Sequence, residues 1–403
     1  MHIYTPLQHE EIRVLRCRRL STSAGPTRCY ATIKGPAFTT LSHEIGIDQV
    51  SLTACPPFVA LSYVWGSPDR DYRLTLCDNS LLPITKSVAE ALTYVLDDIE
   101  DVLIWIDQIC INQSDTEEKN QQVAKMGDIY RKACRVFIWL GPEGDGAERV
   151  DRIFQDFEKS RVNSTTEAVL REAFIFSLEA HLNRQAMIST MKLPWFERAW
   201  VVQEFMLARE AILVHGRFRW HPDTMFLVTC LFRNIGRESF SEFLDHEISY
   251  LRKNHPFQIM QNNKEIHEDF YSLLSRMSSG CKVSEPRDLV YAFLALNKDH
   301  RIQIRPTYDV PSFERRLLWE YVLVLRNRRL FVTADGRIGL TQNCVKAGDT
   351  IIIAHGSATP LVIRAINEKK RIFRLIGQCY LEKAMFGEEY NFEKWPGSSF
   401  IIA

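Results

Sequence analysis

Three nearly continuous apolar runs stand out in the first third of the chain. They are FVALSYVWG (58–66), VLIWID (102–107) and RVFIWLG (135–141). Such runs are typical of strands that are covered on both faces, as in a parallel sheet. The segments 85–98 and 114–134 between them repeat apolar residues at helical spacing. The order strand, helix, strand, helix, strand therefore predicts a parallel sheet with right-handed crossovers.

Turn and cap signals refine this pattern. The segment 73–84 alternates around Asp78-Asn79, which predicts a β-hairpin before the first helix. Ser114 with Glu117 three residues later fits a capping box, so the second helix is expected to begin there. Asn112 lies just before the same helix and is a candidate cap as well.

The remainder of the chain divides by its composition. Residues 147–192 predict one or two amphipathic helices with a polar break near 163–166, and 211–220 predicts a hairpin around His215-Gly216. After residue 335, short β-rich runs alternate with Gly and Asp turns, and the apolar ending SFIIA is expected to be tied into the fold. We therefore expect an α/β core with large helical insertions and a small C-terminal β module. The domains expected are a lead-in segment (1–57), the core (58–210), a mainly helical extension (211–334) and the β module (335–403).

Composition narrows the class of protein. Apolar residues make up 46% of the 403 residues, which is enough for a substantial core. Lys plus Arg and Asp plus Glu both total 50, so a polyanion is not expected as the main partner, and the stretch RVLRCRR is interpreted as a solvated face. The ten cysteines form no C-x-x-C pair and no zinc pattern. No run reaches the roughly 18 apolar residues of a membrane span. We expect a cytoplasmic protein with reduced thiols, no metal and no nucleic-acid partner.

The candidate chemistry lies where the predicted strands end. In parallel sheets, ligands bind at the carboxyl ends of strands, near a switch in strand order. The three strand exits are Trp65-Gly66-Ser67, Asp107 to Gln113, and Gly141-Pro142-Glu143, and we expect them to converge on one cleft. Asp107, Gln108 and Asn112 then either line a pocket or cap a sharp turn, and the sequence leaves both interpretations open.

A second acid lies in the stretch RAWVVQEF. Glu204 is flanked by apolar residues, a costly position for a charge unless it is paired or used. Arg198 precedes it by six residues, so the two would have to meet through the fold rather than along one helix. A structural ion pair of Glu204 with Arg198 or Arg131 is the alternative.

Two other reactive side chains are assigned structural roles. Cys110 follows the second strand, but no histidine occurs in residues 44–180 to serve as its base. A buried thiol is therefore expected rather than a nucleophile. His215 lies in the predicted hairpin and is expected to be structural.

Several of these stretches resemble the heterokaryon incompatibility (HET) domain proteins of filamentous fungi. The matching stretches are ALSYVWG (60–66), LIWIDQICINQSDTEEKNQQVAKMGDIYRKACRVFIWLG (103–141) and WFERAWVVQEFMLA (195–208). The stretches EIRVLR and PRDLVYAFLAL and the tail around GQCYLEKAMFGEE are similar to the flanking segments of the family. The resemblance therefore touches nearly the whole chain and is strongest over 58–208.

The resemblance implies a role in non-self recognition and programmed cell death. It also implies a fold distantly related to the flavodoxin-like Toll/interleukin-receptor (TIR) domain, some members of which cleave NAD at the nicotinamide–ribose bond. On this hypothesis Glu204 and Asp107 are catalytic, and Trp65 stacks on a ring of the substrate. Further substrate-binding residues are Gly66, Gln108, Asn112, Arg198 and Gln203.

NAD would be the substrate, and no cofactor is firmly implied. The chain lacks a G-x-x-x-x-G-K-[ST] phosphate loop, so Arg131, Arg135 and Arg198 are candidates to hold the two phosphates. The alternatives are a non-catalytic module of the same fold that self-associates or binds a protein partner, and a degenerate family member with a scaffolding role.

Overall fold

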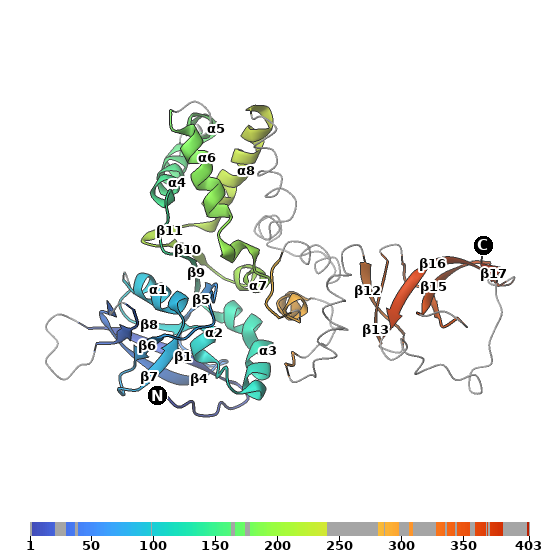
Figure 1. Ribbon diagram of the computed structural model, residues 1–403, viewed down its shortest axis with the longest axis horizontal. Helices are drawn as coiled ribbons and strands as arrows, with labels where there is room; N and C mark the ends of the chain where they lie inside the picture. The colour runs from blue at the N-terminus through green and yellow to red at the C-terminus, as the bar shows by residue number, and fades with distance from the viewer. Residues whose placement is uncertain are drawn as a thin grey trace. The chain divides into compact units, whose positions relative to one another are not determined.

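We describe the fold from a computed structural model of the chain (Figure 1). The described residues run from 2 to 239 with gaps at 21–29, 37–38, 98, 163–165 and 174–177; they continue over 281–285, 287–297, 306–308, 328–334, 337–342, 345–354, 359–367, 369, 371–381 and 401–402. They form two compact units. One holds a seven-stranded and a four-stranded sheet with most of the described helices, and the other holds a six-stranded sheet. The domain boundaries given above stay a prediction.

The seven-stranded sheet has the spatial order β11-β10-β9-β5-β8-β1-β4. The four strands β10, β9, β5 and β8 run parallel to their neighbours, whereas β11, β1 and β4 are added antiparallel. The parallel sheet predicted from the three apolar runs is thereby confirmed. The strand bounds are Glu11–Arg19 (β1), His43–Ser51 (β4), Val59–Tyr63 (β5), Val102–Trp105 (β8), Arg135–Gly141 (β9), Ala211–His215 (β10) and Phe218–Trp220 (β11).

The N-terminal segment supplies two of these strands. β1 pairs with both β4 and β8, so residues before 58 extend the sheet of the core. The interpretation of RVLRCRR as a solvated face was therefore wrong. Arg13 is only 1% exposed, because Glu118 holds it in an ion pair of 2.6 Å. Arg16 is partly buried between Glu44 and Asp48.

The smaller sheet has the order β3-β2-β6-β7, and it contains the predicted hairpin. Its strands are Thr32–Lys34 (β2), Thr39–Thr40 (β3), Tyr72–Thr75 (β6) and Leu81–Ile84 (β7). The turn between β6 and β7 places Asn79 in the left-handed region at φ 63°, a conformation that asparagine tolerates better than most residues.

Two crossover helices connect the parallel strands. α1 (Lys86–Val95) is capped by Thr85, and its Tyr94 stacks on Trp139 of β9 with ring centroids 5.2 Å apart. α3 (Thr116–Lys132) places Tyr130 edge-on against Trp105 of β8 at 5.6 Å. Aromatic pairs of this kind contribute about 0.5–1.5 kcal/mol beyond their buried area, so they fix both helices on the sheet.

The start of α3 differs by one residue from the predicted capping box. Asp115 is the cap, because its side chain accepts a hydrogen bond of 3.0 Å from the backbone N–H of Glu118. Ser114 and Glu117 therefore do not form the predicted pair. Asn112 instead closes the preceding turn, since its Oδ1 accepts from the N–H of Ser114 at 3.2 Å.

Most of the described residues between β9 and the C-terminal sheet are helical, as predicted. The hairpin of β10 and β11 is confirmed, whereas three helices lie in the described part of 147–192, where one or two were predicted. Residues 163–165 of the predicted polar break lie outside the described residues. Within the predicted helical extension, residues 240–280, 286, 298–305 and 309–327 lie outside the described residues. The helices are Asp107–Cys110 (α2), Ala147–Val162 (α4), Thr166–Arg171 (α5), Ala180–Met191 (α6), Pro194–Glu197 (η2), Trp200–Met206 (α7), Pro222–Ser239 (α8), Asp288–Tyr291 (α12) and Leu294–Leu296 (η3). No helix of the described part of the chain is long and apolar enough to cross a membrane.

The second unit is a β module with the strand order β12-β13-β16-β15-β14, and β17 pairs with β16. The β-rich C-terminal module is thereby confirmed, although its first strand begins at Arg328, before the predicted start. Ile401 and Ile402 of the apolar ending pair with β16, as expected. The strands are Arg328–Val332 (β12), Ile338–Gln342 (β13), Thr350–Ile352 (β14), Leu361–Asn367 (β15), Ile372–Leu381 (β16) and Ile401–Ile402 (β17).

Candidate functional site

The first two strand exits meet in the structure. β5 and β8 are parallel neighbours, so their carboxyl ends lie at one edge of the sheet. Trp65 follows β5, and its Nε1 donates a hydrogen bond of 2.7 Å to Oδ2 of Asp107, which follows β8. Both side chains are partly exposed. The edge of the sheet thus presents an aromatic ring and a carboxylate side by side.

Asp107 also has a local structural role. It is the first residue of the short helix α2, and its Oδ1 accepts a hydrogen bond of 2.7 Å from the N–H of Gln108. Capping and a role in the site were the two alternatives for this residue. The carboxylate has one oxygen on the backbone and the other on Trp65, so the geometry is compatible with both.

Glu204 enters the same region from α7 and is 3% exposed. The Ser62 hydroxyl of β5 donates a hydrogen bond to Oε2 of Glu204. Trp195 Nε1 donates in turn to the Ser62 hydroxyl at 2.8 Å. The hydroxyl of Tyr130, which donates to the carbonyl of Leu61 at 3.1 Å, also acts on the Glu204 carboxyl. This acid is thus held by a hydroxyl network in the interior.

Arg198 joins the two acids. The chain is extended at this residue, between η2 and α7, so Arg198 and Glu204 do not share one helix. The Arg198 guanidinium donates to the backbone carbonyl of Tyr63, and its charge acts on both Asp107 and Glu204. The charge of Arg198 therefore acts on Glu204 through the fold, and not along one helix.

Burial dominates the electrostatics of the site. Loss of solvation raises the pKa of Glu204 to about 7, although Arg198 and the Ser62 hydroxyl oppose the shift. Loss of solvation also raises the pKa of Asp107, against Arg198 and the Trp65 hydrogen bond. The charge of Asp107 further disfavours ionisation of Glu204. The Glu204 carboxyl can therefore exchange a proton near neutral pH.

The predicted amide residues are dispersed. Gln108 is buried and turned toward α1, where its Oε1 accepts a hydrogen bond of 2.9 Å from the N–H of Thr85. The N–H of Asn112 donates to Glu118 at 2.7 Å, in the loop before α3. Gln203 lines a separate cavity. Gly66 is exposed at φ +69°, and it allows the chain to turn away directly after Trp65.

The third strand exit and two of the three arginines have other partners. Glu143 accepts the N–H of Arg217 at 2.7 Å and so binds the β10–β11 hairpin. Arg131 pairs with Asp128, and Arg135 pairs with Glu210. Among the three arginines considered for phosphate binding, Arg198 alone interacts with the acids in the described part of the chain.

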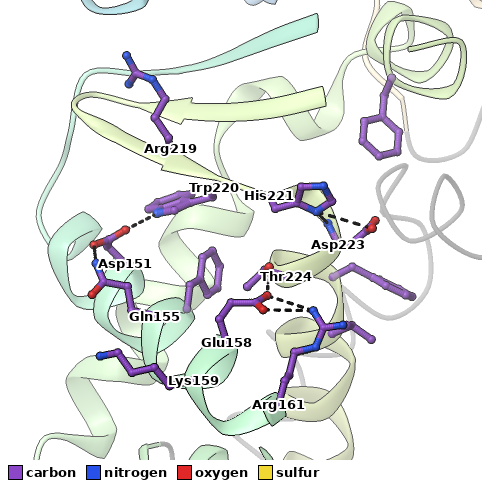
Figure 2. A pocket seen from close by; sticks show the side chains of 14 residues that line it. Asp151, Gln155, Glu158, Lys159, Arg161, Arg219, Trp220, His221, Asp223 and Thr224 are labelled. Carbon is purple, nitrogen blue, oxygen red and sulfur yellow. Dashed lines mark hydrogen bonds and ion pairs between the residues drawn. The ribbon is translucent and has the colours of Figure 1, made fainter. Parts of the chain in front are cut away.

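A cavity of ≈ 820 Å³ lies between α4, α8 and β11 (Figure 2). Its wall includes Trp220, whose Nε1 donates to Asp151 at 3.0 Å, and Glu158, which accepts from Thr224 and Arg161. Phe205 lines this cavity, but Asp107 and Glu204 do not. This cavity is therefore separate from the acid cluster, the name used from here on for Asp107 and Glu204 together with Ser62, Tyr130, Trp195 and Arg198.

Cys110 is buried, as predicted, and His215, which was expected to be structural, is buried as well. Burial raises the pKa of the Cys110 thiol to about 12, which leaves almost no thiolate at neutral pH. The His215 ring packs edge-on against Trp220 with centroids 5.4 Å apart. Neither residue contacts the acid cluster through any hydrogen bond or ion pair found among the described residues.

Sequence reasoning did not single out Ser62, Tyr63, Tyr130 and Trp195, which surround the acids. Ser62 carried a signal, because it is the one small polar side chain within the apolar strand FVALSYVWG. Buried polar side chains require a partner, and Glu204 is that partner. Tyr130 and Trp195 fit the pattern of core residues equally well, so composition alone could not place them at the site.

Two segments of the chain match models of known families. Residues 58–204 match the family model described as Heterokaryon incompatibility protein (HET), and residues 313–394 match the model described as Het-6 beta-barrel domain. The chain is 32% identical over 196 residues to "Heterokaryon incompatibility protein 6, OR allele" of Neurospora crassa. This match covers 40% of the chain and 29% of that relative. No solved structure matches the chain. The resemblance to the heterokaryon incompatibility family is thereby confirmed.

Proposed function

We propose that this chain, which carries a HET domain over residues 58–204, acts in fungal non-self recognition and programmed cell death by hydrolysing NAD at the nicotinamide–ribose bond. The biological part of the proposal is supported by the relative of Neurospora crassa, whose name assigns it to heterokaryon incompatibility. The chemical part is supported by one observation. Asp107, Glu204, Arg198 and Trp65 converge at the carboxyl end of the central strand β5.

The strand order supports a flavodoxin-like, TIR-type core. Counted along the chain, the parallel strands β5, β8, β9 and β10 are the first to the fourth, and their spatial order is 2-1-3-4. Flavodoxin-like sheets have the order 2-1-3-4-5 and bind their ligand at the switch beside strand 1. Here strand 1 is β5, whose carboxyl end adjoins both acids.

Each residue then has a role in the hydrolysis. Water attacks the anomeric carbon of the ribose while the C–N bond breaks, and nicotinamide leaves as a neutral molecule with the bonding electrons. Asp107, the more exposed acid, stabilises the positive charge that develops on the ribose. Glu204 accepts the proton of the water, because its pKa of about 7 suits proton exchange at neutral pH. The half-buried Trp65 offers a ring face for stacking.

A non-catalytic module of the same fold is the second candidate. The observation that favours it is the burial of Glu204, which is 3% exposed and bonded to Ser62 as a structural acid would be. Such a module would self-associate or bind a protein partner, and the acid cluster would hold α7 on the sheet.

NAD consumption distinguishes the two candidates. We expect the full chain at high concentration to release nicotinamide, and Asp107→Asn and Glu204→Gln to reduce the rate about 100-fold or more, the usual scale for lost electrostatic or acid–base catalysis. Asp71→Asn and Glu117→Gln are matched controls at exposed acids and should keep the rate of the wild type. Folding of each variant is checked by circular dichroism. A wild-type chain that stays silent even when it is tethered into oligomers would exclude the hydrolase and favour the binding module.

A further inference from the structure

Two hydrogen bonds beside Glu204 have a fixed direction. Trp195 Nε1 donates to the hydroxyl of Ser62 at 2.8 Å, and this hydroxyl donates to Oε2 of Glu204. An indole N–H can only donate, and a serine hydroxyl carries a single proton. Because the Ser62 oxygen accepts from the indole, its one proton is left for the carboxyl. These two hydrogen bonds are called the Ser62 bridge from here on.

The Ser62 bridge lies in the interior. Trp195, Ser62 and Glu204 are 0%, 1% and 3% exposed. Ser62 belongs to the central strand β5, whose five residues are all buried, while Trp195 and Glu204 come from η2 and α7. Solvent has almost no access to this position, so the indole, and not water, orients the hydroxyl.

The direction of donation decides which oxygen of Glu204 takes a proton. Oε2 faces the O–H of Ser62, so it accepts a hydrogen bond in both protonation states, and a proton placed on it would meet the Ser62 proton. The exchanging proton is therefore carried by Oε1. A hydrogen bond to a carboxylate is roughly twice as strong as one to a neutral acceptor, so the Ser62 bridge also favours the ionised form.

The other groups that act on this carboxyl come from three places in the fold. Arg198, between η2 and α7, opposes the effect of burial on the pKa of Glu204, and the charge of Asp107 on α2 adds to it. Tyr130 of α3 also acts on the carboxyl, but the hydroxyl of Tyr130 donates to the carbonyl of Leu61 at 3.1 Å. The Ser62 hydroxyl differs from that of Tyr130, because its proton is directed at the carboxyl.

We propose that Ser62 and Trp195 are positioning residues for Glu204: the indole fixes the Ser62 hydroxyl, the hydroxyl holds Oε2, and Oε1 is left to take the proton of the attacking water. The Ser62 bridge thereby sets the pH at which Glu204 exchanges its proton. The inference rests on the proposed hydrolysis for the role of Glu204 as a base. The effect of the bridge on the carboxyl, however, can be measured without NAD.

Urea denaturation between pH 5 and pH 9 measures this effect. Each protein is compared with the same protein carrying Glu204→Gln, and the difference in their free energies of unfolding changes up to the pH at which Glu204 ionises in the folded state, about 7 in the wild type. We expect Ser62→Ala to move this limit up by about one pH unit, because the bond to the carboxylate is lost. Ser62→Thr keeps a hydroxyl and should restore the limit of the wild type.

Trp195→Phe tests the first bond of the bridge. It keeps an aromatic ring but removes the donor, so the Ser62 hydroxyl can turn away from Glu204. We expect a shift in the same direction as that of Ser62→Ala, but smaller. Water that entered the space left by the indole would move the limit in the opposite direction, because it would solvate the carboxylate. If Ser62→Ala does not fold, its combination with Trp195→Phe replaces it, since no indole N–H is then left unpaired.

Two matched controls lie outside the acid cluster. Ser160 is a buried serine whose hydroxyl donates to the carbonyl of Phe157 at 2.6 Å. Trp220 is a buried tryptophan whose Nε1 donates to Asp151 at 3.0 Å. Ser160→Ala and Trp220→Phe should both leave the titration of Glu204 at the pH of the wild type.

The results separate this inference from the proposed hydrolysis. A titration limit that Ser62→Ala or Trp195→Phe leaves unchanged overturns the inference, whether or not NAD is consumed. Where the protein consumes NAD, the rise of the rate with pH should move with the titration, and a rate that does not follow it overturns the positioning role. Shifted titrations in a protein that consumes no NAD support the Ser62 bridge and overturn the hydrolysis alone.

Discussion

At the scale of single residues, Glu204 shows how burial sets the chemistry of the site. Its carboxyl interacts with Ser62, Tyr130, Asp107 and Arg198, and loss of solvation outweighs the favourable charge of Arg198. The pKa rises from 4.5, the ordinary value of a glutamate, to about 7 in the folded chain. A group at this value is half protonated at neutral pH. Proton exchange and stability therefore depend on the same residue.

The raised pKa predicts a pH-dependent cost in stability. Below pH 4.5 the acid is protonated in both the folded and the unfolded state. As the pH rises from there to about 7, the unfolded chain loses the proton first, so the free energy of unfolding falls. Glu204→Gln cannot titrate. We expect its stability relative to the wild type to rise by on the order of 1–3 kcal/mol over this range and to stay level above it.

Urea denaturation at pH 5, 6, 7 and 8 measures this difference. Glu117→Gln, at an exposed acid of α3, should run parallel to the wild type at every pH. A difference between Glu204→Gln and the wild type that stays constant across the range would contradict the buried, proton-exchanging acid.

At the scale of elements, the N-terminal strand and α3 depend on one buried ion pair. Arg13 of β1 donates to both carboxylate oxygens of Glu118 and to the carbonyls of Cys110 and Thr5. Glu118 also accepts the N–H of Asn112 at 2.7 Å. The pair therefore fixes the turn that follows Asp107, and with it the exit of β8.

Removing one partner of this ion pair should lower the free energy of unfolding more than removing both charges does. Arg13→Met leaves the Glu118 carboxylate buried without its partner, which we expect to cost about 3–5 kcal/mol of stability. Arg13→Met combined with Glu118→Gln should recover at least about half of that loss, because no buried charge remains and the glutamine oxygen still accepts from Asn112. Chemical denaturation of the wild type, both single variants and the double variant measures the coupling. Additive effects of the two substitutions would mean that the ion pair does not hold β1 on α3.

The elements that could be predicted were those with a local signal. The strands at 58–66, 102–107 and 135–141 are largely buried, so their sequences are almost wholly apolar. β1 is also mostly buried, but its arginines break the apolar run. The partner that neutralises Arg13 lies 105 residues further along the chain. No local pattern can reveal such a pairing, and the strand was therefore missed.

The candidate site was predictable to a similar degree. Asp107 stood out at a strand exit and Glu204 among apolar residues, and the charge of Arg198 acts on both acids. The predicted amide residues do not lie beside the acids, because neighbouring positions along the chain point in different directions. Gln203 and Glu204 are adjacent on α7 and face separate regions of the molecule. A sequence gives the position along the helix, but the side that each residue faces depends on packing.

At the scale of the whole molecule, the acid cluster is contained in the first compact unit. The residues of the cluster come from β5, α2, α3 and the segment 195–206. The last strand of the seven-stranded sheet, β11, ends at Trp220, so the whole sheet also lies in this unit. The second unit has its own small core of Val345, Val362 and Cys379. The two units also match separate family models, at 58–204 and 313–394. We therefore expect the proposed hydrolysis of NAD to require the first unit but not the C-terminal β module.

A chain that ends at residue 309 tests this separation. We expect it to keep the far-ultraviolet circular dichroism spectrum of the first unit. We also expect it to consume NAD at a rate within about threefold of the full chain at equal molar concentration, because every residue of the acid cluster remains. Loss of a catalytic residue, by contrast, would lower the rate about 100-fold. The same chain carrying Asp107→Asn is the control and should consume NAD about 100-fold more slowly or less. If the shortened chain is folded but silent, the C-terminal β module contributes to turnover through assembly or through the site itself. Tethering the shortened chain into oligomers distinguishes these two roles. It should restore NAD consumption if the module acts through assembly, and it should not do so if the module contributes to the site.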